Sequence, residues 1–273
     1  MTGSLYLVST PIGNLGDMSY RAVEVLTSAA LVIAEDTRHS RRLLDHYRVE
    51  TPLRSYHEHN EAKETPRLVE RLRAGDSIAL ISDAGTPLIS DPGSRLVAAA
   101  IAEGIPVVPI PGASSVMAAL VGSGMSLERF SFYGFLPRKG KDRQEAIDDV
   151  VNSRSTVVIF EAPSRVGGTL EDLVMAGAGD RDAVVARELT KQFEEFNRGT
   201  VGELATTYAE RDPKGEVVIV VAAAEKTTLS ESELSDAARE LKGSGKPARE
   251  IMNHLVSALG APRNLAYKIA HED

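Results

Sequence analysis

Short apolar runs alternate with amphipathic stretches along the first half of this 273-residue chain. Apolar side chains fill consecutive positions of each run, which is typical of strands buried on both faces of a parallel sheet. The stretches between the runs place apolar side chains at helical spacing. Strand and helix in alternation predict a parallel α/β sheet with right-handed crossovers. The expected strands are 5–9, 31–34, 77–81 and 106–110, and the expected helices include 19–28, 65–74 and 94–103.

The alternation of apolar runs and amphipathic stretches is interrupted at 121–128, which is rich in Gly, Ser and Met, and it resumes after this segment. We therefore expect one α/β domain at 1–121 and a second one, with a mixed sheet, at 122–225. After a linker at 225–230, three short segments separated by Gly and Pro predict a small helix-turn-helix-like domain at 230–273. The expected strands of the second domain are 130–134, 156–160, 183–186, 193–198 and 217–222, and the last three helices are 231–241, 247–259 and 263–271.

Composition narrows the function without assigning one. The net charge of −8 argues against a protein that coats nucleic acid nonspecifically, although it leaves room for a local basic patch. The chain has no cysteine and therefore no disulfide framework. It shows neither a signal-peptide pattern nor an apolar run of the ~20 residues that a membrane span needs. We expect a cytoplasmic protein.

Residues 82–93, Ser-Asp-Ala-Gly-Thr-Pro-Leu-Ile-Ser-Asp-Pro-Gly, follow the expected strand at 77–81. Two glycines and two prolines fix an unusual backbone there, at the edge of an α/β sheet where ligands bind. Asp83 and Asp91 disfavour a polyphosphate and suit hydroxyls or a cation. One such loop alone could be a tight turn, but four together favour a ligand cleft that lacks a nucleotide-binding signature. The other three loops begin at Thr10, Pro111 and Glu161.

Other polar groups allow both a structural and a functional interpretation. His57 and His59 would point to the same side if their segment were extended, but without cysteine or an HExxH motif we expect no metal site. Ser114 and Ser115 either cap a helix or line a ligand. The segment 187–191 places the carboxylate of Glu188 and the amine of Lys191 at a strand end, where they either form a salt bridge or take part in catalysis. A basic loop is either solvated or in contact with a phosphate backbone, and it carries Arg138, Lys139, Lys141 and Arg143.

These motifs resemble the tetrapyrrole-methylase-like superfamily of S-adenosylmethionine-dependent methyltransferases, and within it the subfamily that acts on small-subunit ribosomal RNA. The resemblance runs from residue 5 to about residue 222, and the tail resembles that subfamily's C-terminal helical domain. The chain departs from the family pattern at Ala162, where Ser is expected, and at Phe193, where Tyr is expected. The resemblance rests on the segments 9–17, 35–38, 56–60, 82–93, 111–113, 134–137, 187–191, 214–216 and 263–267.

The resemblance implies two α/β domains of the class III methyltransferase type, usually in a homodimer, with S-adenosylmethionine in the cleft between the domains. It also implies methylation of the ribose 2′-oxygen of a cytidine in 16S ribosomal RNA, within the small ribosomal subunit. By position in the motifs, it assigns donor binding to Pro11, Ile12, Asp83, Gly85, Thr86, Ser114, Ser115, Ala186 and Gly215.

In-line attack of a ribose hydroxyl on the donor's methyl group depends on positioning and benefits from a base. We assign Glu188 as the proton acceptor and Lys191 as the group that orients or polarises the hydroxyl. Asp36 and Arg38 form the competing set, with Arg38 holding a phosphate. Two alternatives remain: a different methyl acceptor, either a corrin-type ring or a protein side chain, and a non-catalytic RNA-binding assembly factor. Contacts with the RNA backbone are expected from Arg138, Lys139 and Lys141.

Overall fold

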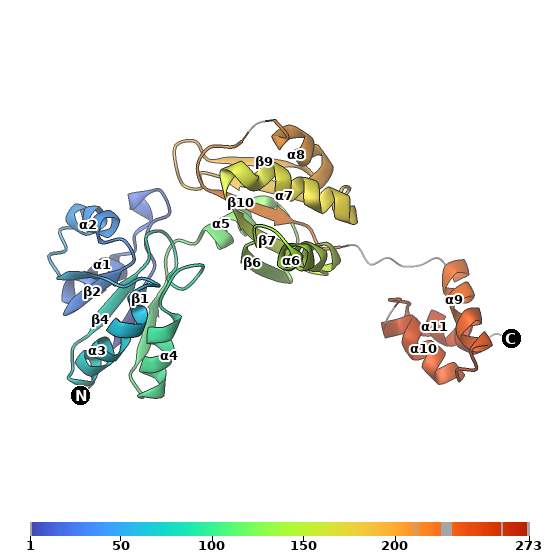
Figure 1. Cartoon of the computed structure of the whole chain (residues 1–273), viewed down its shortest axis with the longest axis horizontal. Helices are drawn as coiled ribbons and strands as arrows, with labels where there is room; N and C mark the ends of the chain where they lie inside the picture. The colour runs from blue at the N-terminus through green and yellow to red at the C-terminus, as the bar shows by residue number, and fades with distance from the viewer. Residues whose placement is uncertain (1, 211, 225–230, 258, 272–273) are drawn as a thin grey trace. The chain divides into compact units, whose positions relative to one another are not determined.

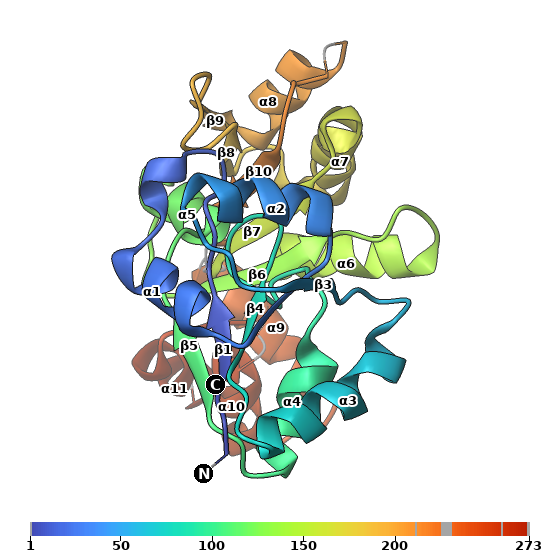
Figure 2. The same cartoon turned by 90° about the vertical axis from the view of Figure 1, so that its left-hand side faces the viewer.

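The computed structural model describes residues 2–210, 212–224, 231–257 and 259–271. The chain divides into two compact units, residues 1–223 and residues 224–273. Figures 1 and 2 show the first unit from two sides, with one sheet in its blue-to-green part and another in its green-to-orange part. The predicted boundary at residue 121 falls inside helix α5 (Ser115–Ser123), so the division of this unit into two domains stays a prediction.

The first sheet is parallel throughout, as predicted, with the strand order β3-β2-β4-β1-β5. Helices α1 (Tyr20–Ser28) and α2 (Thr37–His46) cover one face, and α3 (Glu61–Arg73) and α4 (Ser94–Ala102) cover the other. The chain leaves β1 toward one face and β4 toward the other, so a topological switch point lies between these neighbouring strands. The strands are β1 (Leu5–Val8), β2 (Leu31–Ala34), β3 (Leu53–Ser55), β4 (Ile78–Ile81) and β5 (Val107–Ile110).

The second sheet is mixed, as predicted, with the order β6-β7-β10-β8-β9. Strands β6 and β7 pair in parallel, and the other three pairs are antiparallel. Helix α5 packs on one face, where Val116 and Leu120 join a buried cluster with Val184 and Val218. Three helices cover the opposite face. The elements are β6 (Phe130–Phe135), α6 (Lys141–Asn152), β7 (Thr156–Glu161), α7 (Val166–Leu173), β8 (Asp182–Arg187), β9 (Glu195–Thr200), α8 (Val201–Tyr208) and β10 (Val217–Val221).

Two local features differ from the sequence-based expectation. The sequence pattern does not predict β3, because this edge strand has three residues and no apolar run. Helix α3 begins at Glu61 rather than at residue 65, and Pro66 lies inside it. Burial of Leu68 and Leu72 compensates for the backbone hydrogen bond that the proline removes. Helix α7 ends at Leu173, and a π turn at Val174–Ala178 follows it.

The tail forms the three predicted helices, α9 (Glu231–Gly243), α10 (Ala248–Ser257) and α11 (Arg263–His271). They enclose a core of their own, which includes Leu234 and Ile251. The predicted linker at 225–230 lies outside the described residues. Within the part of the chain that the structure describes, no helix is long and apolar enough to cross a membrane.

Candidate active site

Three loops meet at the carboxyl edge of the first sheet, beside the switch point between β1 and β4. The backbone groups of Thr10 and Gly85 exchange two hydrogen bonds, of 2.9 and 3.0 Å. Ser9 Oγ donates to Thr86 Oγ1 at 3.3 Å, and Thr86 Oγ1 donates to the carbonyl oxygen of Ala113 at 3.2 Å. The loops that follow β1, β4 and β5 are therefore tied directly to one another.

The backbone of the loop 82–93 is strained where it turns. Gly85 has a φ of 81°, and a Cβ atom there would lie 3.2 Å from Ile12 Cγ2. Leu88 and Ser90 adopt left-handed φ values of 73° and 65°. Non-glycine residues in this region cost about 1–3 kcal/mol each and cluster at functional sites. Strain and cross-links together favour a rigid edge suited to holding a ligand.

The fourth predicted loop has a different role. Glu161 is the last residue of β7, and its side chain is fully buried. Its Oε1 accepts a hydrogen bond from Arg165 Nε at 2.6 Å, and its Oε2 accepts one from Thr169 Oγ1 at 2.6 Å. This network fastens α7 to the second sheet. Glu161 lines neither of the two pockets described below.

Glu188 and Lys191 form an ion pair just after β8. Lys191 Nζ donates to Glu188 Oε1 at 2.9 Å and to Glu216 Oε2 at 3.1 Å. The backbone N–H of Glu216 also donates to Glu188 Oε1, at 3.1 Å. Glu188 and Thr190 have left-handed φ values of 50° and 66°, so this turn is strained like the loop 82–93. The structure therefore brings the two predicted catalytic residues together.

Two glycines make room for this ion pair. A Cβ atom on Gly13 would lie 2.3 Å from Lys191 Cγ, which no real contact allows. Gly215 has a φ of 86°, and a Cβ atom on it would lie 2.0 Å from Glu188 Oε1. Gly215 thus has a packing role in the structure, and its predicted contact with the methyl donor stays a prediction.

Hydrogen bonding sets the charge of both partners. The hydrogen bond from the Lys191 ammonium holds the pKa of Glu188 below its ordinary value. Burial lowers the pKa of Lys191, but hydrogen bonds to Glu188 and Glu216 outweigh burial and raise this pKa overall. Both groups are therefore ionised at neutral pH. The lowered pKa makes Glu188 a weak base, whereas Lys191 is well suited to hold an anion or a hydroxyl oxygen.

Lys191 faces the first sheet across a pocket of about 300 Å³, here called the Lys191 pocket. A second pocket, of about 470 Å³, lies beside the third loop and is called the Ser114 pocket. Thr86 and Ser114 line it together with Phe130 and Phe132 of β6. Five of the nine predicted donor-binding residues line these pockets, three of them the Lys191 pocket and two the Ser114 pocket. The Lys191 pocket is lined by Pro11, Ile12, Gly13, Leu15, His39, Arg42, Leu43, Asp83, Ala84, Lys191 and Glu216.

Acidic side chains around Asp83 repel one another. Burial raises the pKa of Asp91 to about 6, and the negative charges of Glu35 and Asp83 add to this effect. Asp36 behaves differently, because hydrogen bonds from Arg38 lower its pKa to about 2. The backbone N–H of Asp36 donates to Asp83 Oδ1 at 3.2 Å. A bound cation would relieve the repulsion at Asp91, so this carboxylate set fits a positively charged ligand.

Several predicted site residues lie outside both pockets. Ala186 is buried in β8 within the cluster under α5. Ser115 is the first residue of α5, next to Ser114, which caps this helix by accepting a hydrogen bond from the Met117 N–H. The predicted basic loop is only partly a loop, because Arg138 and Lys139 precede α6 whereas Lys141 and Arg143 lie in its first turn. The three predicted RNA-binding side chains, Arg138, Lys139 and Lys141, are exposed and line neither pocket, and Arg143 is held by Asp172 instead of facing solvent.

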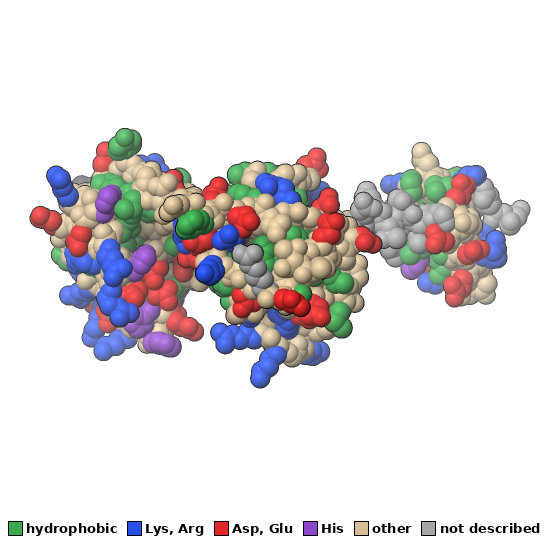
Figure 3. Space-filling view, turned by 90° about the horizontal axis from the view of Figure 1, so that it is seen from above, with side chains coloured by type: hydrophobic (Ala, Val, Ile, Leu, Met, Phe, Trp, Pro, Cys, Tyr) green, Lys and Arg blue, Asp and Glu red, His purple; other side chains and the backbone are tan. Residues whose placement is uncertain are grey.

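Helix α2 contributes two residues that the sequence analysis does not single out, His39 and Arg42. Both line the Lys191 pocket, and Arg38 and Arg41 lie exposed on the same helix. Figure 3 shows Lys and Arg side chains gathered with histidines on the surface of this part of the first unit. The sequence signal was the run Arg38-His-Ser-Arg-Arg42, but only the fold places it beside Lys191.

Comparison with known proteins identifies the family. The family described as tetrapyrrole (corrin/porphyrin) methylases matches residues 4–205. The chain belongs to this methylase family. A relative from Synechocystis sp. is 45% identical over 99% of this chain and 98% of its own length. One from Pseudomonas aeruginosa is 44% identical over 98% of this chain and 96% of its own length. Both relatives are named ribosomal RNA small subunit methyltransferase I.

Solved structures of other proteins share the methylase fold. A diphthine synthase superposes with a TM-score of 0.62 and 18% identity, covering 97% of this chain and 99% of its own. Uroporphyrin-III C-methyl transferase from Thermus thermophilus, solved with S-adenyl homocysteine, gives a TM-score of 0.58 and 17% identity, covering 81% and 97% of the two chains. At these identities the likeness concerns the fold, and it agrees with the predicted class III methyltransferase architecture.

Proposed function

We propose that this protein transfers a methyl group from S-adenosylmethionine to the ribose 2′-oxygen of a cytidine in 16S ribosomal RNA. The observation that carries the proposal is the end-to-end similarity, at 45% identity, to a relative named ribosomal RNA small subunit methyltransferase I. The ionised Lys191 beside a basic helix supports an RNA acceptor, because RNA presents both hydroxyls and phosphates. We infer the 2′-oxygen of a cytidine as the methylated atom from the resemblance of the motifs.

The residues of the three linked loops fit the methyl donor. When bound, S-adenosylmethionine supplies an electrophilic methyl group on a positively charged sulfur. The carboxylates of Asp83, Asp91 and Glu35 suit that charge and the hydroxyls of a ribose. The rigid edge reduces the entropy lost on binding. We assign donor binding to Pro11, Ile12, Asp83, Gly85, Thr86, Ser114, Ser115, Ala186 and Gly215.

For the acceptor, Lys191 orients the ribose hydroxyl and stabilises the charge that develops on its oxygen. Glu188 holds Lys191 in place and is the proposed proton acceptor. Because its pKa is lowered, proton transfer to Glu188 is uphill in the free enzyme. Asp36 is the less favoured base, since hydrogen bonds from Arg38 hold its pKa at about 2. Replacing Glu188 by Gln should slow a single turnover without changing donor affinity, and an unchanged rate would reject its role.

RNA approaches over exposed cations in two segments of the first unit. Arg38 lies on α2 beside the Lys191 pocket, and the basic loop carries the other proposed contacts, Arg138, Lys139 and Lys141. Neutralising these side chains should flatten the salt dependence of RNA binding, and an unaltered slope would exclude them from the interface. We further propose a cytoplasmic homodimer that acts on the small ribosomal subunit.

The decisive experiment measures transfer of labelled methyl from S-adenosylmethionine to small subunits and to naked 16S RNA, both from a strain that lacks this protein. Mass spectrometry then maps the label. Label on one cytidine ribose establishes the reaction, and the preferred substrate shows whether an assembled subunit is required. Donor binding without label on either substrate would indicate another acceptor. If the purified protein does not bind S-adenosylmethionine, it is a non-catalytic assembly factor.

A further inference from the structure

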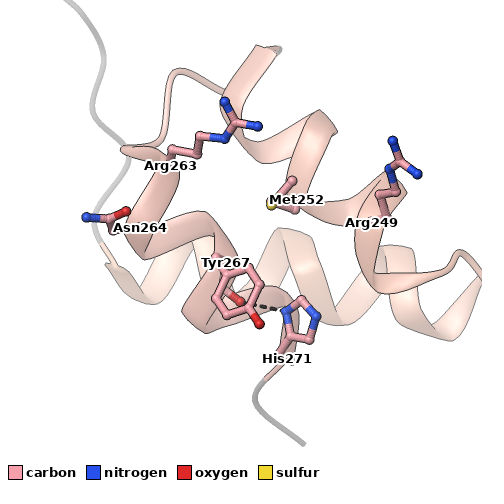
Figure 4. A pocket seen from close by; sticks show the side chains of 6 residues that line it. All are labelled: Arg249, Met252, Arg263, Asn264, Tyr267 and His271. Carbon is pink, nitrogen blue, oxygen red and sulfur yellow. Dashed lines mark hydrogen bonds between the residues drawn. The ribbon is translucent and has the colours of Figure 1, made fainter.

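The tail unit has an open pocket of about 470 Å³ between α10 and α11, shown in Figure 4. Its volume lies within the range of ~300–1,000 Å³ typical of small-ligand sites. In Figure 4 the guanidinium groups of Arg249 and Arg263 stand on either side of Met252, and two rings occupy the remaining edge. The six residues that line the pocket are Arg249, Met252, Arg263, Asn264, Tyr267 and His271.

The charge of the tail is unevenly distributed. Four of the five carboxylates in residues 231–271 lie on α9, whereas the pocket holds two arginines and no acid. Arg249 and Arg263 are both exposed, and among the described residues neither forms an ion pair. By contrast, Lys268 pairs with Glu231, and Arg239 pairs with Asp236. A nearly neutral domain therefore presents a local cationic site for an anion.

The aromatic edge of the pocket is held in a fixed position. Tyr267 and His271 stack with their ring centroids 4.2 Å apart and their planes 29° from parallel. His271 Nδ1 lies 2.9 Å from the Tyr267 carbonyl oxygen, which anchors the imidazole to α11. Tyr267 is nevertheless 58% exposed. An exposed aromatic ring with a second ring behind it is a platform on which a nucleobase can stack.

We infer that this pocket binds a single-stranded segment of the RNA substrate, with one base stacked on Tyr267 and flanking phosphates held by Arg249 and Arg263. The inference rests on the proposed function, because it names the tail as a second contact with that RNA. An acidic peptide would use the arginines, but it would leave the aromatic platform and the Asn264 amide without a purpose. Single-stranded RNA uses all three features, since its bases stack and hydrogen-bond while its backbone is anionic.

The test measures binding of 16S RNA to the full-length protein across salt concentrations. Arg249→Gln and Arg263→Gln should each reduce the slope of log affinity against log salt by about 0.7. Tyr267→Ala should weaken binding by about fivefold to 100-fold, and Tyr267→Phe should retain most of the affinity because it keeps the ring. Arg239→Gln removes the same charge from α9, outside the pocket, and should bind RNA like the wild type.

Methyl transfer separates this role from a structural one. The pocket variants should raise KM for RNA, while kcat at saturating RNA and the Kd for S-adenosylmethionine stay unchanged. If the variants match Arg239→Gln in RNA affinity while the wild type methylates RNA, the inference is overturned and the proposed function stands. If the pocket variants bind naked RNA normally but bind small subunits more weakly, the pocket contacts a ribosomal protein rather than RNA, and the inference is overturned. A wild type that neither binds nor methylates RNA would remove the proposed function itself.

Discussion

Asp91 should make the free protein less stable as its carboxyl ionises. A pKa of about 6 in place of the ordinary 3.8 means that the ionised form costs up to about 3 kcal/mol in the folded state. Solvent reaches part of the side chain, so screening reduces this cost to about 1–2 kcal/mol. The folded state binds more protons than the unfolded state between about pH 4 and pH 6. Stability attributable to Asp91 is therefore present below this window and lost as pH rises through it.

Asp91→Asn removes the ionisation and keeps the size of the side chain. The variant should be more stable than the wild type by about 1–2 kcal/mol near pH 8, or about 2–8 °C in Tm, and nearly equal to it at or below about pH 4. Thermal and urea unfolding followed by circular dichroism at the two pH values measures the difference. Asp83→Asn is the matched control, because removing one neighbouring charge should lower the pKa of Asp91. Equal stability near pH 8, or the same difference at both pH values, would refute the reasoning.

The same variant tests the fit of the site to a cation. A positively charged donor favours the ionised carboxyl, so donor affinity of the wild type should rise as pH increases through about 6. Asp91→Asn should bind the donor more weakly near pH 8 and lose this pH dependence. Isothermal titration with S-adenosylmethionine between about pH 5 and pH 8 provides the measurement. A wild-type affinity independent of pH would separate Asp91 from the donor site.

Three other substitutions probe the site and its support. Lys191→Met should lower kcat about a hundredfold or more with donor Kd retained, and a normal kcat would remove Lys191 from the chemistry. Gly215→Ala should lower the free energy of unfolding by about 1–3 kcal/mol and displace Glu188, so turnover should fall. Gly177 has a φ of 95° and open space around it, so Gly177→Ala should lower stability alone. Equal turnover in the two variants would contradict the packing argument. Glu161→Ala should destabilise the fold by about 3–5 kcal/mol in urea titrations, because it breaks a buried ion pair, and a loss under about 1 kcal/mol would count against that role.

Features that depend on neighbours in sequence could be predicted from the sequence. Strands β2 and β10 are unbroken buried apolar runs, so their residue types alone indicate their burial. Ser19 opens the helix predicted at 19–28, and it caps α1 because its Oγ accepts the Ala22 N–H at 3.1 Å. Thr200 caps α8 in the same manner and completes a capping box with Glu203. Such caps are short-range interactions, and local sequence determines them.

Contacts between distant segments could not be predicted in this way. The fit of Lys191 against Gly13 joins the loop after β1 to the turn after β8, and no local pattern encodes that meeting. Arg42 looks like an ordinary solvated side chain until the fold places α2 beside the Lys191 pocket. The raised pKa of Asp91 depends on burial and on Glu35, which lies on another loop. These properties arise from tertiary structure, so residue types alone do not reveal them.

The cluster under α5 also determines how the first unit unfolds. Ile12 of the first loop is buried in the same cluster as Val116 of α5 and Val184 of the second sheet. This cluster ties the loop after β1 to the core of the second sheet, so we expect the two sheets to melt in one cooperative transition. The tail has its own core around Leu234 and Ile251, and a unit of 50 residues buries a smaller share of its surface.

Calorimetry should therefore resolve two transitions, one for each unit. Amide hydrogens at Thr10 and Gly85 should exchange with solvent only when the whole first unit opens, because their mutual bonds lie beside Ile12 of the cluster under α5. Amides of the tail helices should exchange faster, through independent opening of that unit. The loops that we assign to the methyl donor would then remain ordered even while the tail is transiently unfolded.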